Sequence, residues 1–211
     1  MSQIILSDLQ VAGVKKITGN LSRGMGCLLA FDMGLGKTLV CVKSIDILFK
    51  KNKTKYGKFL IICPPSVMSF WKQEFQKVNF EGTIFINHKS YKHEEHTLET
   101  ADVVIISYHG ALGIDTTLFK TVMIDESQEI RNHNTKLHKL CKTKLSLLPG
   151  RVAITGTPIS NSLSDIYNLF EFIQPRLLGS PYEFKRHYTL MVKRGLDKNA
   201  TPRHKTVALN I

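Results

Sequence analysis

The sequence has no apolar run long enough to cross a membrane. Its longest apolar runs, such as residues 59–63, have the length of a strand and fall far short of the roughly 20 residues that a membrane helix needs. The first residues also lack the charged region, apolar segment and small-residue cleavage site of a secretory signal. These absences predict an intracellular protein, of the nucleus or cytoplasm, with no membrane partner.

The sequence also lacks the cysteine spacing of a zinc or redox site. Its 4 cysteines lie far apart, and no two form a Cys-x-x-Cys pair. Because three of them stand inside apolar stretches, we expect all four to be reduced residues of the core. They are Cys27, Cys41, Cys63 and Cys141.

Charge is unevenly divided between the two signs. The chain has 29 Lys and Arg against 17 Asp and Glu, a formal net charge of +12. Such an excess is typical of proteins that bind the phosphates of nucleic acid, although it also serves solubility alone. The charge becomes informative only beside other motifs.

Six short apolar runs alternate with helix-like segments, which predicts a parallel sheet covered by helices. The expected strands are residues 26–31, 58–63, 83–86, 102–107, 121–124 and 151–155, and the expected helices are residues 37–49, 66–78, 135–147 and 163–173. The near-continuous apolar character of the runs indicates strands buried on both faces. A chain of 211 residues suits one such domain, which we place at residues 1–190, followed by a basic linker or tail at 191–211. The basic segment 50–58 is expected to be a solvated loop.

The strongest local motif is Asp32-Met-Gly-Leu-Gly-Lys-Thr38, between an expected strand and an expected helix. Gly34 and Gly36 allow the backbone amides of residues 33–38, Met33 and Leu35 included, to surround a triphosphate at the positive end of the following helix. In such a loop Lys37 neutralises the β and γ phosphates, and the hydroxyl of Thr38 binds Mg²⁺. The alternative is a chance glycine-rich turn.

An acidic pair follows a second buried strand. In Thr121-Val-Met-Ile-Asp125-Glu126 the two carboxylates stand at the strand's carboxyl end. Behind a phosphate loop, Asp125 is expected to bind Mg²⁺ through water and Glu126 to orient the water that attacks the γ-phosphate. Taken alone, the pair could equally well open the next helix, where acidic residues are favourable.

In their order along the chain, these motifs and their neighbours resemble the first RecA-like lobe of the Swi/Snf family, helicase-like ATPases of superfamily two. The fold class that this implies is α/β, a RecA-like P-loop NTPase lobe. The segment 6–13 resembles the family's adenine-recognition segment, so Gln10 is the expected reader of the base. Gln128 stands where the family commonly has the histidine of Asp-Glu-Ala-His. The segment 153–158, Ala-Ile-Thr-Gly-Thr-Pro, resembles the family motif that couples the state of the bound nucleotide to DNA binding.

The resemblance implies duplex DNA as a partner, held through its phosphates. Hydroxyl and amide side chains in the matching segments are the candidate contacts, since phosphate contacts position a protein without reading bases. These candidates are Ser66, Ser107, Tyr108, Asn132, Thr157 and Asn161. Trp71 and Phe75, one helical turn apart, could stack on DNA, but we expect them in the core.

No second lobe can be identified after Leu190. In the family that lobe supplies arginines that reach the γ-phosphate, so we expect a piece of a longer protein that binds ATP weakly and hydrolyses it slowly. Three functions remain open: a translocase on double-stranded DNA, a strand-separating helicase, and a non-hydrolysing DNA-binding or nucleotide-switch module.

Overall fold

The computed structural model describes residues 4–91, 96–158 and 163–192. Within them one sheet of parallel strands has the order β1-β6-β5-β2-β4-β3. The strands are β1 (Cys27–Leu29), β2 (Phe59–Ile62), β3 (Ile84–Asn87), β4 (Val103–Ile106), β5 (Thr121–Ile124) and β6 (Gly150–Ile154). Each expected strand is present, with ends within two residues of the prediction. The α/β fold class with a parallel sheet is confirmed.

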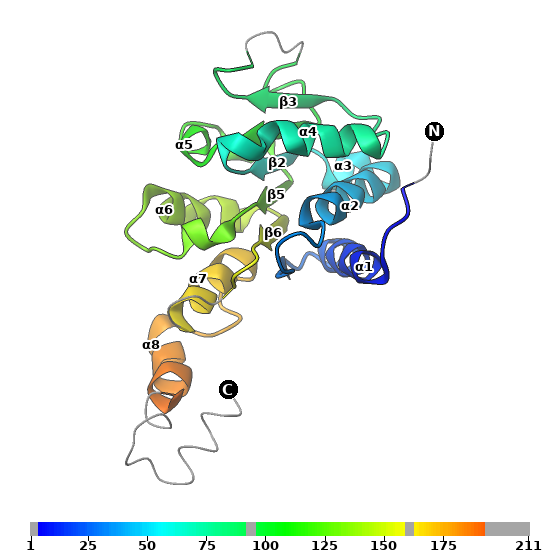
Figure 1. Ribbon diagram of the computed structural model, residues 1–211. Coiled ribbons are helices and arrows are strands. Elements are labelled where there is room, and N and C mark those ends of the chain that lie inside the picture. Colours follow the sequence, from blue (N-terminus) through cyan, green and yellow to red (C-terminus); the bar gives the residue numbers. More distant parts are fainter. Residues whose placement is uncertain (1–3, 92–95, 159–162, 193–211) are drawn as a thin grey trace.

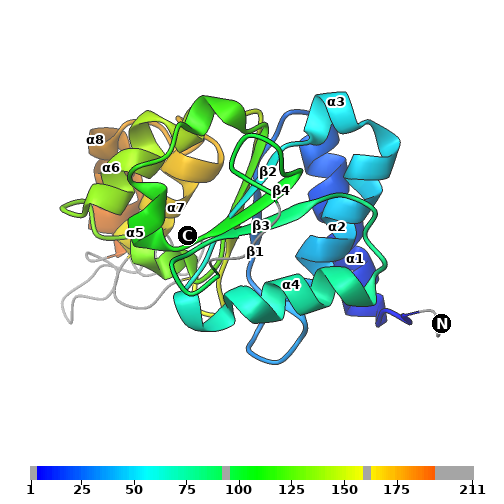
Figure 2. The same ribbon diagram turned by 90° about the horizontal axis from the view of Figure 1, so that it is seen from above.

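Helices cover both faces of the sheet (Figures 1 and 2). On one face lie α1 (Asp8–Ser22), α2 (Lys37–Lys51), α3 (Lys53–Tyr56) and α4 (Met68–Lys77). On the other lie α5 (Tyr108–Ala111), α6 (Lys136–Thr143) and α7 (Leu163–Ile173). The sheet therefore separates two apolar cores.

Side chains of the central strands enter these two cores alternately. Phe59 and Ile61 of β2 pack with α1, α2 and α4, whereas Leu60 and Ile62 pack with α6 and α7. All four are fully buried. This two-sided burial explains why the strand sequences are continuously apolar.

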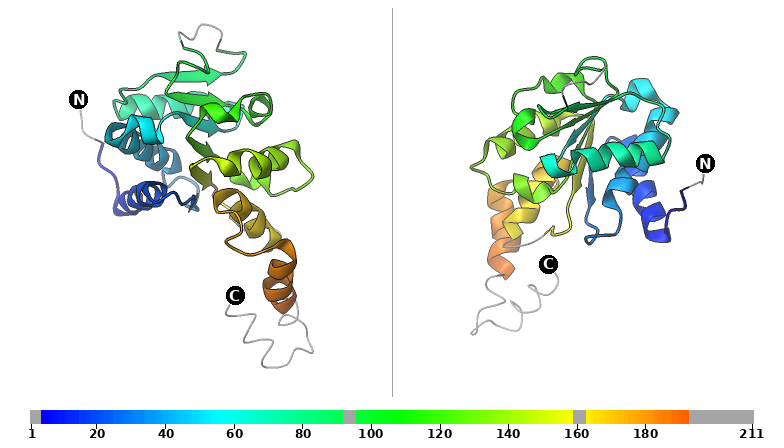
Figure 3. Two further views of the ribbon diagram at one scale, coloured as in Figure 1. Left: turned by 180° about the vertical axis from the view of Figure 1, so that it is seen from behind. Right: turned by 45° about the horizontal axis from the view of Figure 1, so that its top comes forward.

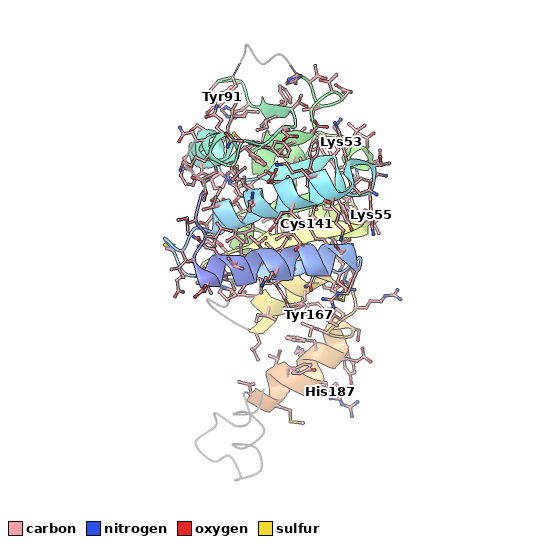
Figure 4. All side chains as sticks on the ribbon, turned by 90° about the vertical axis from the view of Figure 1, so that its right-hand side faces the viewer. Lys53, Lys55, Tyr91, Cys141, Tyr167 and His187 are labelled. Atoms are coloured by element: carbon pink, nitrogen blue, oxygen red, sulfur yellow. The ribbon has the colours of Figure 1, made fainter. Side chains whose placement is uncertain are left out.

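Three features of the helices differ from the sequence prediction. The helix expected at 135–147 ends at Thr143, and a separate 3-10 turn, Leu145–Leu147, follows it. The basic segment 50–58, expected to be a loop, contains the end of α2 and the short helix α3, because Tyr56 turns inward and is buried. Lys53 and Lys55 remain exposed, at the end of α2 opposite to residues 33–38 (Figure 4). The helix α1 had not been predicted at all.

Beyond α7 the chain turns into α8 (Pro181–Phe184) and a π-helical segment, Lys185–Thr189. This part extends away from the sheet (Figures 1 and 3). It is attached to α7 by the ring of Phe184, which lies 4.9 Å from that of Tyr167, and within this part Phe184 also lies 5.1 Å from the ring of Tyr188. The expected linker or tail lies outside the described residues from position 193 onward.

All four cysteines are free and buried, as predicted. Burial raises the pKa of Cys27 to about 11, which keeps this thiol protonated at neutral pH. Among the described residues, no helix has both the length and the apolar character to span a membrane.

Candidate nucleotide-binding site

The predicted phosphate loop joins the end of β1 to the start of α2. Gly34 and Gly36 both have left-handed backbones, with φ of +80° and +76°. Non-glycine residues adopt this conformation at a cost, so the two glycines determine the path of the loop. Gly36 is the N-cap of α2 and no side chain caps the helix, so the amides of its first turn are left to donate hydrogen bonds to an anionic ligand.

The amino group of Lys37 folds back across this loop. Its Nζ donates to the carbonyl oxygens of Phe31 at 3.0 Å and Asp32 at 3.1 Å. A β-carbon on Gly156, in the segment after β6, would lie 3.6 Å from the same nitrogen. The predicted coupling segment 153–158 therefore borders the phosphate loop.

Gln10 also lies against the loop. It forms a reciprocal capping box with Ser7 at the start of α1, in which its Oε1 accepts from the Ser7 amide at 3.0 Å. Its Nε2 donates to the carbonyl of Leu35 at 3.2 Å. The glutamine expected to read adenine thus ties α1 to the phosphate loop, whereas the side chains of Met33 and Leu35 are exposed.

Asp125 follows β5 and is held from several sides. Its Oδ2 accepts from the indole Nε1 of Trp71 at 3.0 Å, and its Oδ1 accepts from the amide of Glu126 at 3.0 Å. Its backbone carbonyl accepts from the hydroxyl of Tyr108 at 2.7 Å. Only 9% of Asp125 is exposed.

Burial raises the pKa of Asp125 above its ordinary value, although the Trp71 hydrogen bond, the Glu126 amide and the positive charge of Lys37 act in the opposite direction. Since β1, β6 and β5 are parallel neighbours in the sheet, the acidic pair after β5 lies at the same edge as the loop after β1.

Glu126 begins a line of side-chain hydrogen bonds that leads to the end of β6. Its Oε2 accepts from Nε2 of Gln128 at 2.6 Å, and Oε1 of that glutamine accepts from the hydroxyl of Thr155 at 2.9 Å. The Thr155 oxygen in turn accepts from the amide of Thr157 at 3.0 Å. Gln128, in place of the family's histidine, therefore connects the acidic pair to the segment 153–158. Glu126 itself has a left-handed backbone, with φ of 45°, which is strained for a non-glycine residue.

The described residues among those expected to contact DNA follow the carboxyl ends of strands, but their environments differ. Ser66, Asn132 and Thr157 are exposed. Ser107 is half-buried and caps α5 by accepting from the Gly110 amide at 3.0 Å. The hydroxyl of Tyr108 is occupied by the Asp125 carbonyl, so this atom points into the protein, and Asn161 lies outside the described residues.

Sequence reasoning missed the contact between Trp71 and Asp125. Trp71 and Phe75 are fully buried, which confirms their assignment to the core and excludes stacking on DNA. The indole N–H nevertheless needs a hydrogen-bond acceptor when buried, and this requirement was a signal available from the sequence. Its partner, 54 residues away, could come only from the fold.

Together, fold and site define a parallel α/β lobe with the predicted phosphate loop and an acidic pair at one edge of its sheet. A protein-family model described as the SNF2-related domain matches residues 9–208. The chain therefore belongs to the SNF2-related family, and the predicted resemblance to the first lobe of Swi/Snf helicase-like ATPases is confirmed.

Individual relatives agree. The chain is 30% identical over 232 residues to the DNA repair protein rhp54 of Schizosaccharomyces pombe, covering 95% of this chain and 26% of that protein. It is 33% identical over 196 residues to the DNA repair and recombination protein RAD54B of Gallus gallus, covering 88% of this chain and 21% of that protein. The chain thus spans about a fifth to a quarter of the length of these curated relatives.

A solved structure gives the same result. The Sulfolobus solfataricus SWI2/SNF2 ATPase core in complex with dsDNA superimposes with a TM-score of 0.77 at 32% identity. The match covers 98% of this chain and 43% of that chain. The RecA-like lobe predicted from the sequence is confirmed.

Proposed function

We propose that this chain is the ATP-binding lobe of a DNA-dependent ATPase that translocates on double-stranded DNA and couples hydrolysis to remodelling of DNA or nucleoprotein. One observation carries the proposal. Glu126, beside the Asp125 carboxylate, is joined through Gln128 and Thr155 to the backbone of Thr157, which is exposed at the sheet edge. A change at the nucleotide can therefore reach a surface residue through direct contacts.

Binding of ATP would use the loop described above. The amides of residues 34–38 and the start of α2 would surround the phosphates, and Lys37 would exchange its two carbonyl partners for the β and γ phosphates. Gln10, beside the loop, would contact the adenine.

Thr38 and Asp125 would hold magnesium together with the phosphates, because hydroxyl and carboxylate oxygens are the ligands that this ion prefers. When bound, Mg²⁺ supplies charge neutralisation at the phosphates. Glu126 would orient the attacking water, with its own carboxylate held by Gln128. A second RecA-like lobe would supply arginines, so this lobe alone would hydrolyse ATP near the background rate.

Duplex DNA is the proposed partner, and the net charge of +12 supports it. The SWI2/SNF2 core that superimposes on this chain was solved in complex with dsDNA. Exposed Ser66, Asn132 and Thr157, together with Ser107, Tyr108 and Asn161, are the proposed contacts to phosphates. Binding through phosphates would be independent of sequence and would weaken steeply with salt. As a protein that acts on DNA, it would lie inside the cell.

The test is ATP hydrolysis by a chain extended through a second lobe, with and without duplex DNA. We expect stimulation by duplex DNA and loss of hydrolysis in Lys37→Ala. Normal hydrolysis by this variant would show that the site is wrongly assigned, and absence of any DNA effect would favour a nucleotide switch. Strand displacement by the same protein would identify a helicase instead of a translocase.

A further inference from the structure

The single tryptophan of the chain lies in the candidate site, although its burial makes it look like an ordinary core residue. Trp71 is on α4, and its ring is fully enclosed by the core between α4 and the sheet. An indole has one donor and no acceptor, so its N–H can make one hydrogen bond. That bond goes to a carboxylate oxygen of Asp125, at 3.0 Å.

The remaining contacts of Asp125 do not duplicate this one. The Tyr108 hydroxyl and the backbone carbonyl of Ile62 hold the main chain of Asp125, through its carbonyl and its amide. The amide of Glu126 binds Oδ1 from the adjoining residue. Within the part of the chain that the structure describes, Trp71 is the residue from another element of the fold that donates to the carboxylate. The Trp71 N–H on Oδ2 and the Glu126 amide on Oδ1 therefore fix the orientation of the carboxylate together.

The helix that carries Trp71 also borders the phosphate loop. A cavity of about 250 Å³ is lined by Gly36 and Thr38 on one side and by Phe70 and Glu74 of α4 on the other. One residue of α4 thus contacts the acidic end of the site, and its neighbours flank the end that holds the phosphates. This placement makes α4 a wall of the nucleotide site.

We infer that Trp71 is a positioning residue, which holds Asp125 in the orientation needed to bind magnesium nucleotide. The inference rests on the proposed function. Residues that orient a metal ligand through a hydrogen bond typically change metal affinity by about 10- to 100-fold when removed. Phenylalanine keeps the aromatic ring in the core but removes the donor, so Trp71→Phe separates packing from orientation.

The first experiment measures binding of a fluorescent ADP, excited directly, to the 211-residue chain at increasing magnesium concentration. In Trp71→Phe we expect the magnesium concentration at half-maximal binding to rise about tenfold or more, with unchanged affinity for the nucleotide in EDTA. Phe75→Leu is the matched control. Phe75 is on the same helix and equally buried, but its ring packs against that of Phe80 at 5.0 Å and has no group that could donate to Asp125. It should lower thermal stability without moving the magnesium midpoint.

The second experiment uses the emission of Trp71 itself, which no other tryptophan obscures. We expect ADP to change this emission with magnesium present and not in EDTA, and Asp125→Asn to abolish the change. An unshifted magnesium midpoint in Trp71→Phe, or an equal shift in Phe75→Leu, would overturn the inference while leaving the proposed function intact. Failure of the unaltered chain to bind nucleotide at any magnesium concentration would contradict both.

Discussion

Replacing Gln128 by leucine should slow ATP hydrolysis more than it weakens ATP binding. The change removes two hydrogen bonds, one from Nε2 to the Glu126 carboxylate at 2.6 Å and one from the Thr155 hydroxyl at 2.9 Å. A bond to a charged group contributes about 1.5–3 kcal/mol and a neutral one about 1 kcal/mol. If about 2 kcal/mol of this orients Glu126 in the transition state, kcat falls about 30-fold.

The assay is steady-state ATP hydrolysis with saturating duplex DNA, in a chain extended through a second lobe. KM for ATP should stay within about twofold, since the side-chain hydrogen bonds of Gln128 go to Glu126 and Thr155 and not to residues 33–38. Histidine at this position, the residue common in the family, can donate to one partner and accept from the other, so Gln128→His should recover most of the rate. If Gln128→Leu kept the full kcat, the line of hydrogen bonds would have no role in hydrolysis.

Further predictions concern stability. Gly26→Ala should lower the unfolding free energy by about 1–3 kcal/mol, because the new β-carbon would meet the carbonyl of Ile173 at 2.1 Å. Gly19→Ala, in α1 with open space around it, should raise the unfolding free energy by up to about 1 kcal/mol. Thermal unfolding of both variants tests this, and equal effects would refute it. Burial would raise the pKa of Asp102, but hydrogen bonds from Lys53 and Thr83 outweigh burial and lower it. The stabilising effect of Asp102 is then complete above the ordinary aspartate pKa and is lost as the pH falls through the lowered pKa, so urea unfolding should separate wild type from Asp102→Asn at neutral pH and bring the two together in acid.

The strands were predictable because burial on both faces leaves a signal in the sequence. Residues 59–62 are continuously apolar, and each of their side chains enters one of the two cores. The helix α1 left a weaker signal, since Gly13 and Gly19 interrupt it and few of its residues are buried. The segment 50–58 was predicted to be a loop because lysines dominate its composition, and its one buried side chain, that of Tyr56, gave too weak a signal for a helix.

The candidate site was predictable where chemistry follows directly from local spacing. Lys37 and Asp125 each follow a strand, and parallel strands bring their carboxyl ends to one edge. Contacts that depend on side-chain direction were not predictable. Gln128 reaching Thr155 and Trp71 reaching Asp125 span 27 and 54 residues, and only the folded arrangement of helices and strands brings these pairs together.

The central claim is that ATP or ADP binds at the loop of residues 34–38 and shares magnesium with Asp125. Isothermal titration calorimetry of ADP with the 211-residue chain, at low salt with magnesium, tests it most directly. We predict measurable binding that weakens about tenfold or more in Lys37→Ala and in Asp125→Asn, and is unchanged in Lys43→Ala, whose lysine is paired with Asp46 on the same helix. Absence of binding, or equal affinity in all four proteins, would contradict the account.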